Sequence, residues 1–255
     1  MRAIAIMNNK GGVGKTVTAI NLADILVRQY HKRVILADCD GQMNLTRFYL
    51  PEFDPELNYN MAALLVGDGE PLWSDNLLPL SPGLSLIPGS PELYALDRAA
   101  LQDGVGAPER VREFVLAARE DDGADFFIFD CPPGFTLASV GALMASDEVV
   151  IPMLVDGFSF AGVQDLSAQV ANLRRTRHGI RIGGVLITQW RNTEVVRQGE
   201  QLLRSMGLPV YRQTIRRTEK VPESTLDRQP IWAYSPHSAA SQDYRRWVAE
   251  LVEGV

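Results

Sequence analysis

One short segment near the start of the chain, KGGVGKT at residues 10–16, holds residue types that together bind phosphate groups. Its glycines let the backbone turn tightly, so that several N–H groups point at one place. Lys15 brings positive charge to the β- and γ-phosphates of a nucleotide, and the Thr16 hydroxyl is a ligand for Mg²⁺. The general phosphate-loop pattern is G-x-x-x-x-G-K-[ST]. Asn9 stands where that pattern has its first glycine, and a second lysine, Lys10, follows it. The segment predicts a phosphate-binding loop; the alternative is a glycine-rich turn with two solvated lysines.

Two carboxylates, Asp38 and Asp40, follow the apolar run RVILA at residues 33–37. Side chains at the carboxyl end of a parallel strand face the crevice where open α/β sheets bind ligands. Carboxylate oxygens are hard ligands of the kind that Mg²⁺ prefers. Together with the loop, these two residues indicate a nucleotide–magnesium site; an ordinary turn is the alternative.

The chain alternates apolar runs with segments of helical character. The runs lack polar alternation, which is typical of strands buried on both faces of a parallel sheet. The expected strands are residues 2–7, 33–37, 125–129, 148–152 and 182–188, and the expected helices are 16–30, 161–177, 194–206 and 238–252. This order predicts an α/β fold with a doubly wound, mostly parallel, twisted sheet and helices on both faces. Residues 51–106 read as short helices with an extra strand pair on the same sheet, and residues 1–255 as a single domain.

Three segments resemble the sequence boxes of the ParA/MinD family of deviant Walker A ATPases, which are SIMIBI-like P-loop NTPases. KGGVGKT is similar to the phosphate box with its early lysine, and ADCDGQMN at 37–44 to the Asp-x-Asp-Pro-Gln-x-Asn box, with Gly41 in place of proline. FFIFDCPPG at 126–134 resembles Walker B. The resemblance covers nearly the whole chain, is most diffuse over 51–106, and is strongest to ParA-type, Soj-like partition ATPases.

The resemblance implies roles for the charged residues of these boxes. Lys10 reaches across a dimer interface to the partner's nucleotide, so Lys10, Lys15 and Asp40 are the expected catalytic residues. Asp40 lies near the γ-phosphate, helps to hold Mg²⁺ and positions the attacking water, and Asp38 lies behind the metal's own ligands. Asp130 accepts a hydrogen bond from a water on Mg²⁺ or from Thr16. A buried strand followed by a turn is the alternative for the Asp130 segment.

The resemblance also implies that two strand ends, at residues 184–191 and 211–217, flank the adenine. Arg216 stands where the family has proline. The expected nucleotide contacts are Lys10, Gly11, Gly12, Val13, Gly14, Lys15, Thr16, Val17, Gln189, Ile215 and Arg216, with ATP and Mg²⁺ as the bound species.

Charge is unevenly distributed along the 255 residues, whose formal net charge is −6. Residues 174–220 hold eleven Lys/Arg and three Asp/Glu, a net of +8, so the rest of the chain carries −14. Arginines supply the phosphate contacts of non-specific DNA binding. We expect such contacts from Arg191, Arg197, Arg216, Arg217 and Lys220; solvated helix faces with packed stems are the alternative.

Composition argues against a membrane-spanning, secreted or disulfide-stabilised protein. No apolar run approaches the ~18 residues of a membrane span, and the N-terminus does not read as a signal peptide. Two cysteines, Cys39 and Cys131, do not make a disulfide framework, which favours a reducing cytosol. Buried inert thiols are a commoner outcome for them than a redox or metal role. The final residues carry two glutamates and are a poor membrane anchor.

These observations predict a cytoplasmic ParA-type ATPase, associated with the nucleoid when ATP is bound. An ATP-induced homodimer binds DNA non-specifically and is released when a ParB-like partner stimulates slow hydrolysis to ADP and phosphate, in plasmid or chromosome segregation. The alternative is a MinD-like or related positioning ATPase that acts on a protein cargo or an envelope system. An iron–sulfur carrier is a weaker third reading, because no Cys-x-x-Cys is present.

Overall fold

The computed structural model describes residues 1–67, 73–103, 106–157, 159–176 and 179–253. Within these residues, one seven-stranded sheet has the strand order β3-β4-β2-β5-β1-β6-β7. Neighbouring strands are parallel except β3 and β4, which form the predicted extra pair and are antiparallel. The strands are β1 Arg2–Ile6, β2 Val34–Asp38, β3 Leu78–Ser81, β4 Leu84–Ile87, β5 Phe126–Asp130, β6 Glu148–Met153 and β7 Arg181–Ile187.

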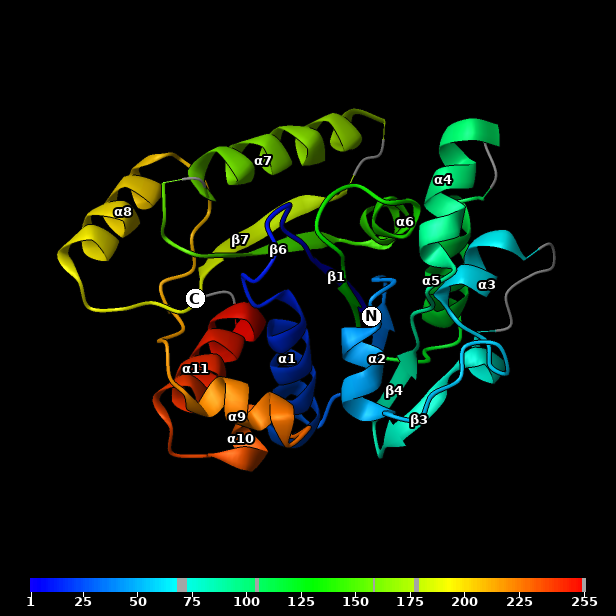
Figure 1. Ribbon diagram of the computed structural model, residues 1–255, viewed down its shortest axis with the longest axis horizontal. Helices are drawn as coiled ribbons and strands as arrows, with labels where there is room; N and C mark the ends of the chain where they lie inside the picture. Colours follow the sequence, from blue (N-terminus) through cyan, green and yellow to red (C-terminus); the bar gives the residue numbers. More distant parts are fainter. Residues whose placement is uncertain (68–72, 104–105, 158, 177–178, 254–255) are drawn as a thin grey trace.

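Helices cover both faces of the sheet, which confirms the doubly wound α/β prediction (Figure 1). One face carries α1 Lys15–Tyr30, α2 Asn44–Tyr49, α9 Lys220–Leu226, α10 Ile231–Tyr234 and α11 Ala239–Glu253. The other carries α3 Met61–Val66, α4 Leu93–Asp103, α5 Glu109–Glu120, α6 Leu137–Ala145, α7 Ser159–Thr176 and α8 Glu194–Ser205, and a short 3₁₀ turn lies at Ser74–Asn76.

Each face has its own apolar core, because the central strands are buried on both sides. Alternate residues of β1 divide between them: Ala3 and Ala5 face the α3–α8 side, whereas Ile4 and Ile6 face the α1–α11 side. The unbroken apolar runs of the sequence follow from this two-sided burial.

The expected strand at residues 211–217 is not a regular strand. Two isolated parallel β-bridges pair this part of the chain with its neighbour: Val210 pairs with Val185 of β7, and Arg216 pairs with Trp190, which follows β7. The described residues include no helix long and apolar enough to cross a membrane.

Candidate nucleotide site

The loop between β1 and α1 surrounds an open hollow. Gly12 and Gly14 have φ values of 72° and 87°, in the left-handed region that glycine tolerates at no steric cost. A Cβ added at Gly11, Gly12 or Gly14 would meet nothing within 4 Å. Gly14 precedes the first turn of α1, whose N–H groups have no partner within the helix. The loop and the positive end of α1 therefore suit an anion such as phosphate.

Lys15 lies inside this hollow. Its side chain is buried, and Nζ donates a hydrogen bond to the carbonyl oxygen of Lys10 at 3.0 Å. Burial lowers the pKa of Lys15, and the nearby Asp130, Cys131 and Asp40 offset part of that effect. A phosphate group in the hollow would favour the charged ammonium further.

Lys10, by contrast, points to a different place. Its Nζ forms an ion pair with Asp156, in the connection between β6 and α7, and lies 3.3 Å from Ser159 Oγ. Asp156 also accepts hydrogen bonds from the Ser159 N–H at 3.0 Å and hydroxyl at 2.8 Å. About a third of the Lys10 side chain is exposed, at 36%. The two lysines of one loop therefore lie in separate environments.

Asp38 and Asp130 end β2 and β5 in direct register. Asp38 accepts hydrogen bonds from the Thr46 N–H at 2.9 Å, the Thr46 hydroxyl at 2.6 Å and the Asp40 N–H at 3.1 Å. Burial raises the pKa of Asp38 to about 6, although these hydrogen bonds favour the charged carboxylate and lower the pKa. Asp38 therefore fixes the turn that follows β2.

Asp130 is buried, and its Oδ1 has no hydrogen-bond partner. Burial and the Asp38 carboxylate raise the pKa of Asp130 well above its usual value, offset in part by the Thr16 hydroxyl and Lys15. A buried carboxylate oxygen without a partner is costly unless a donor reaches it. A water molecule bound to a metal ion is such a donor.

These residues fit a magnesium–nucleotide site. Among the described residues, no three His, Cys, Asp or Glu side chains converge on one metal position. Mg²⁺ beside a nucleotide needs no such cage, because it keeps several waters and binds phosphate oxygens with one or two protein ligands. Thr16 and Asp40 line the cavity, and the free oxygen of Asp130 suits a metal-bound water.

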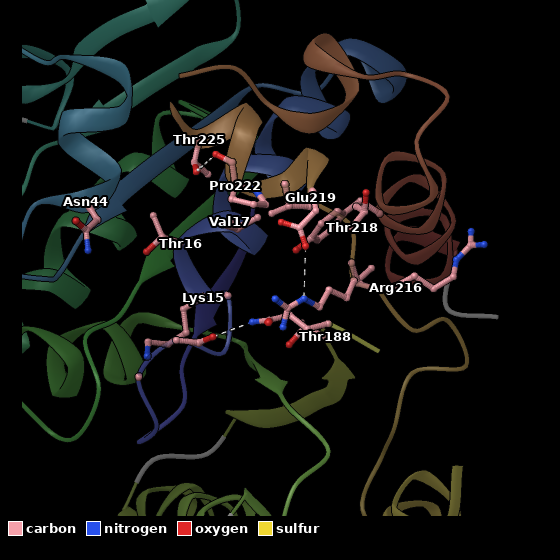
Figure 2. Close-up of a pocket in the computed structure, with 18 of the residues that line it drawn as sticks. Lys15, Thr16, Val17, Asn44, Thr188, Arg216, Thr218, Glu219, Pro222 and Thr225 are labelled. Carbon is pink, nitrogen blue, oxygen red and sulfur yellow. Dashed lines mark hydrogen bonds and ion pairs between the residues drawn. The ribbon is translucent and has the colours of Figure 1, made fainter. Parts of the chain in front are cut away.

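The hollow opens into a cavity of about 530 Å³ that runs to the opposite wall, where Thr218, Pro222 and Thr225 lie (Figure 2). Of the predicted contacts, Gly11, Gly12, Gly14, Lys15, Thr16, Val17, Gln189, Ile215 and Arg216 line it. Lys10 and Val13 do not, although the Thr188 hydroxyl donates to the Val13 carbonyl at 2.8 Å. Gln189 Nε2 donates to the Gly12 carbonyl at 2.9 Å, so the end of β7 is tied to the phosphate loop.

Sequence reasoning missed part of the lining. The missed residues are Gln42, Asn44, Thr188, Thr218, Glu219, Val221, Pro222, Thr225 and Tyr244. Residues 220–231, KVPESTLDRQPI, resemble a further segment of the ParA/MinD family, and that resemblance could have indicated the wall at α9.

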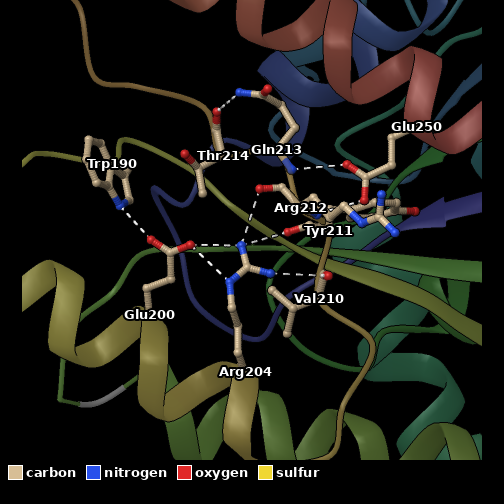
Figure 3. Close-up of polar contacts among 9 residues, drawn as sticks. All are labelled: Trp190, Glu200, Arg204, Val210, Tyr211, Arg212, Gln213, Thr214 and Glu250. Carbon is tan, nitrogen blue, oxygen red and sulfur yellow. Dashed lines mark hydrogen bonds and ion pairs between the residues drawn. The ribbon is translucent and has the colours of Figure 1, made fainter. Parts of the chain in front are cut away.

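Side chains supplement the backbone bonds of the segment that leads to Ile215 (Figure 3). The Tyr211 N–H donates to the Val185 carbonyl at 3.0 Å and the Ile215 N–H to the Ile187 carbonyl at 2.8 Å. Arg204 of α8 donates to Glu200 at 2.8 Å and to the Tyr211 carbonyl at 3.0 Å. Glu250 of α11 accepts the N–H groups of Arg212 at 2.7 Å and Gln213 at 3.0 Å. These contacts satisfy backbone groups that a regular strand would have paired.

Arg216 continues this pattern. Its guanidinium donates to both carboxylate oxygens of Asp243, at 2.8 and 2.7 Å, and its backbone N–H donates to the same carboxylate at 3.0 Å. Asp243 is buried in α11, whereas the Arg216 side chain is 42% exposed. Arg216 thus ties α11 to the cavity wall.

Of the other predicted DNA contacts, Arg217 also lines the cavity. Its N–H donates to the carbonyl of Trp190, the residue before Arg191, at 2.9 Å, whereas Arg197 lies in α8 and Lys220 begins α9.

Acidic residues outside the counted stretch, residues 174–220, pair with several of its cations: Arg216 pairs with Asp243 at 2.7 Å and Lys220 with Glu223 at 2.6 Å. Glu194, which pairs with Arg197 at 2.6 Å, is already in that count. The local positive charge is therefore smaller than the count over residues 174–220 suggests.

Known proteins share both the sequence and the fold. A family model described as an AAA domain matches residues 1–182. The chain is 34% identical to the chromosome-partitioning ATPase Soj of Thermus thermophilus, over 100% of this chain and 97% of that protein.

Two solved structures show the same fold. McdA of Cyanothece, in its apo form, is 21% identical with a TM-score of 0.83 over 99% of both chains. Cobyrinic acid a,c-diamide synthase of Mycobacterium smegmatis, with a bound ATP analogue and magnesium, is 26% identical with a TM-score of 0.81, over 99% of this chain and 94% of that one. The chain belongs to the ParA/MinD family of P-loop ATPases.

Proposed function

We propose that this chain binds and hydrolyses ATP with Mg²⁺ and that ATP drives two copies into a sandwich dimer. The observation that carries the proposal is the separation of the two loop lysines. Lys15 is buried in the hollow, whereas Lys10 lies at the surface, paired with Asp156. A lysine in that position is better placed to contact the nucleotide of a partner copy than the nucleotide bound in its own chain.

In the proposed site, the loop N–H groups and Lys15 hold the β- and γ-phosphates. Thr16 ligates Mg²⁺, and Asp130 holds a water of the metal ion through its free oxygen. Mg²⁺ supplies neutralisation of the phosphate charge. Asp40 orients the attacking water, Asp38 holds the Asp40 turn, and Lys10 of the partner copy stabilises charge on the γ-phosphate. Positioning and electrostatics thus provide the catalysis, which is slow until a ParB-like partner stimulates it.

The ATP-bound dimer, in this proposal, binds DNA non-specifically through Arg191, Arg197, Arg217 and Lys220. The partitioning activity named for the Soj relative supports this choice. Arg216 contributes less to DNA binding than the sequence alone implies, because its guanidinium is engaged by Asp243. The protein would then be cytoplasmic and associated with the nucleoid when ATP is bound.

A positioning ATPase that acts on a protein cargo is the second candidate. The pairing of Arg197 and Lys220 with adjacent glutamates favours it, because a surface with both signs of charge suits a protein as well as DNA.

Retention of the protein on random-sequence DNA, with ATP or ADP and across a salt series, separates the two candidates. DNA binding predicts retention that needs ATP and falls steeply with salt. No ATP-dependent retention at low salt would exclude DNA as the target and favour a protein cargo.

A further inference from the structure

The turn that carries Asp40 is enclosed by residues 89–94, from the part of the chain with the most diffuse family resemblance. Gly89 follows β4, and a Cβ there would lie 2.9 Å from the Asp40 carbonyl oxygen and 3.1 Å from the Asp38 carboxyl carbon. Tyr94, in the first turn of α4, places its ring over Gly41, where a Cβ would lie 2.8 Å from the ring. The turn is therefore held on two sides.

Space, rather than backbone conformation, favours glycine at both positions: a Cβ at Gly89 would meet backbone, whereas a Cβ at Gly41 would meet the Tyr94 ring. Neither Gly41 nor Gly89 is among the residues with positive φ. Gly41 stands where the family pattern has proline, and any side chain at that position would collide with the Tyr94 ring.

The enclosed turn fixes the Asp40 carboxylate. Asp40 Oδ1 accepts the Gln42 N–H at 2.9 Å, and the Asp40 carbonyl accepts the Met43 N–H at 2.9 Å. The Gly89 N–H donates to the Thr46 hydroxyl at 2.9 Å, and that hydroxyl donates to Asp38 at 2.6 Å. The 89–94 segment and the Asp38–Asp40 turn thus share one hydrogen-bond network.

We propose that Gly89 and Tyr94 are positioning residues for Asp40. This inference rests on the proposed function, in which Asp40 orients the attacking water. Gly89 acts by allowing its backbone to lie close to the backbone of Asp40. Backbone atoms cannot move aside easily to admit a Cβ. Tyr94 acts through a side chain that is 45% exposed and can move, so its contribution is the smaller of the two.

The test measures single-turnover hydrolysis and the affinity for a fluorescent mant-ATP in the presence of Mg²⁺. Gly89→Ala lowers the hydrolysis rate roughly 10²-fold and Tyr94→Ala about tenfold, since small misplacement of a catalytic group is costly. The affinity for mant-ATP stays within about twofold, because the loop N–H groups and Lys15 hold the phosphates in the proposed site. Tyr94→Phe keeps the ring and the rate.

Gly41→Ala displaces the Tyr94 ring, so the Gly41→Ala/Tyr94→Ala double variant is no slower than the slower single variant. Two control variants separate positioning from general damage. Leu101→Ala removes an 89% exposed side chain of the same helix. Gly183→Ala creates a similar clash, 2.8 Å from Glu148, in another part of the fold. Both keep the wild-type hydrolysis rate per folded molecule.

Hydrogen exchange of the Gln42 and Met43 amides in the nucleotide-free protein gives a second readout. It accelerates in Gly89→Ala and Tyr94→Ala and not in the controls. Unchanged exchange in both variants would overturn the positioning role, whatever the hydrolysis rates. Asp40→Ala serves as the reference: if it hydrolyses ATP like the wild type, the proposed role of Asp40 fails, and the exchange result then decides the positioning role alone. If Asp40→Ala is slow while Gly89→Ala is not, the positioning role is wrong and the proposed function stands.

Discussion

The two ends of the nucleotide cavity are built in different ways. At the phosphate end, one continuous strand–loop–helix unit, β1 to α1, presents backbone N–H groups and Lys15. At the opposite end, the wall near Ile215 combines backbone bonds, such as the Ile215 N–H to the Ile187 carbonyl, with side-chain contacts across the sequence, such as Arg216 to Asp243 and Gln213 to Glu250. A site made of backbone tolerates few changes in its local sequence, whereas a site held by side-chain pairs can change residue by residue with its partners.

The largest effect is expected at the phosphate end. Lys15→Ala weakens ATP binding by about 10²-fold or more, because charge-assisted hydrogen bonds to phosphate are lost. Calorimetric titration with ATP and Mg²⁺ measures this. Lys10→Ala makes the same change of charge in the same loop and leaves the ATP affinity of the monomer near the wild-type value. Equal affinities for Lys15→Ala and the wild type would show that the loop is not the nucleotide site.

At the other end, Arg216→Ala reduces stability rather than nucleotide contact alone. It leaves the buried Asp243 carboxylate with the backbone N–H of residue 216 but without its charged partner. Loss of the charged partner costs ~3–5 kcal/mol in a fully buried pair. We expect about 2–3 kcal/mol, because the Arg216 side chain is 42% exposed. Urea unfolding measures the change. Arg197→Ala, from an exposed pair, is the control and stays within about 0.5 kcal/mol of the wild type; a loss no larger for Arg216→Ala would remove the contrast between the two ends.

A smaller effect concerns Asp24 of α1, behind the phosphate loop. Burial raises the pKa of Asp24 to about 6, partly offset by Arg28, and Asp24 Oδ2 has no hydrogen-bond partner. The unfolded chain therefore releases this proton at lower pH than the folded protein, so this residue lowers stability as pH rises from about 4 to about 6. Asp24→Asn should stabilise the protein by about 1–2 kcal/mol at pH 8 and by nothing at pH 4. Thermal unfolding at the two pH values measures this; a gain of the same size at both would contradict the assignment.

The smallest expected effect is on DNA binding. Arg191→Ala weakens ATP-dependent DNA binding modestly and lowers the slope of log affinity against log salt by about 1. Arg112, an exposed arginine of α5, provides the matched control, whose replacement by alanine leaves the slope unchanged. Equal slopes for the two variants would place the DNA surface elsewhere.

Much of the architecture could be predicted from the sequence. Uninterrupted apolar runs indicated a parallel sheet because β1, β2, β5 and β6 are buried on both faces. The phosphate loop could be recognised because its chemistry lies in consecutive residues. The strand pair at β3 and β4 was expected, but its place in the sheet was not, because strand order depends on pairing between distant segments.

The remainder depends on partners that are far apart in sequence. The pairing of Arg216 with Asp243 left no local signal, and residues 211–217 read as a strand although side chains of α8 and α11 satisfy much of their backbone. The attachment of Lys10 to Asp156 and the contact of Tyr94 with Gly41 were equally hidden. Acidic partners outside residues 174–220, Glu223 for Lys220 and Asp243 for Arg216, likewise reduce a charge that the count over that stretch overstates.

Light scattering with ATP, ADP and no nucleotide tests the central claim most directly. The account predicts that the wild-type protein, and more completely Asp40→Ala, shifts from monomer to dimer only with ATP and Mg²⁺. Lys10→Ala should bind ATP and remain monomeric, because its surface lysine is the group that reaches the partner's nucleotide. A wild-type mass that does not change with ATP, or a Lys10→Ala variant that dimerises as well as the wild type, would contradict the account.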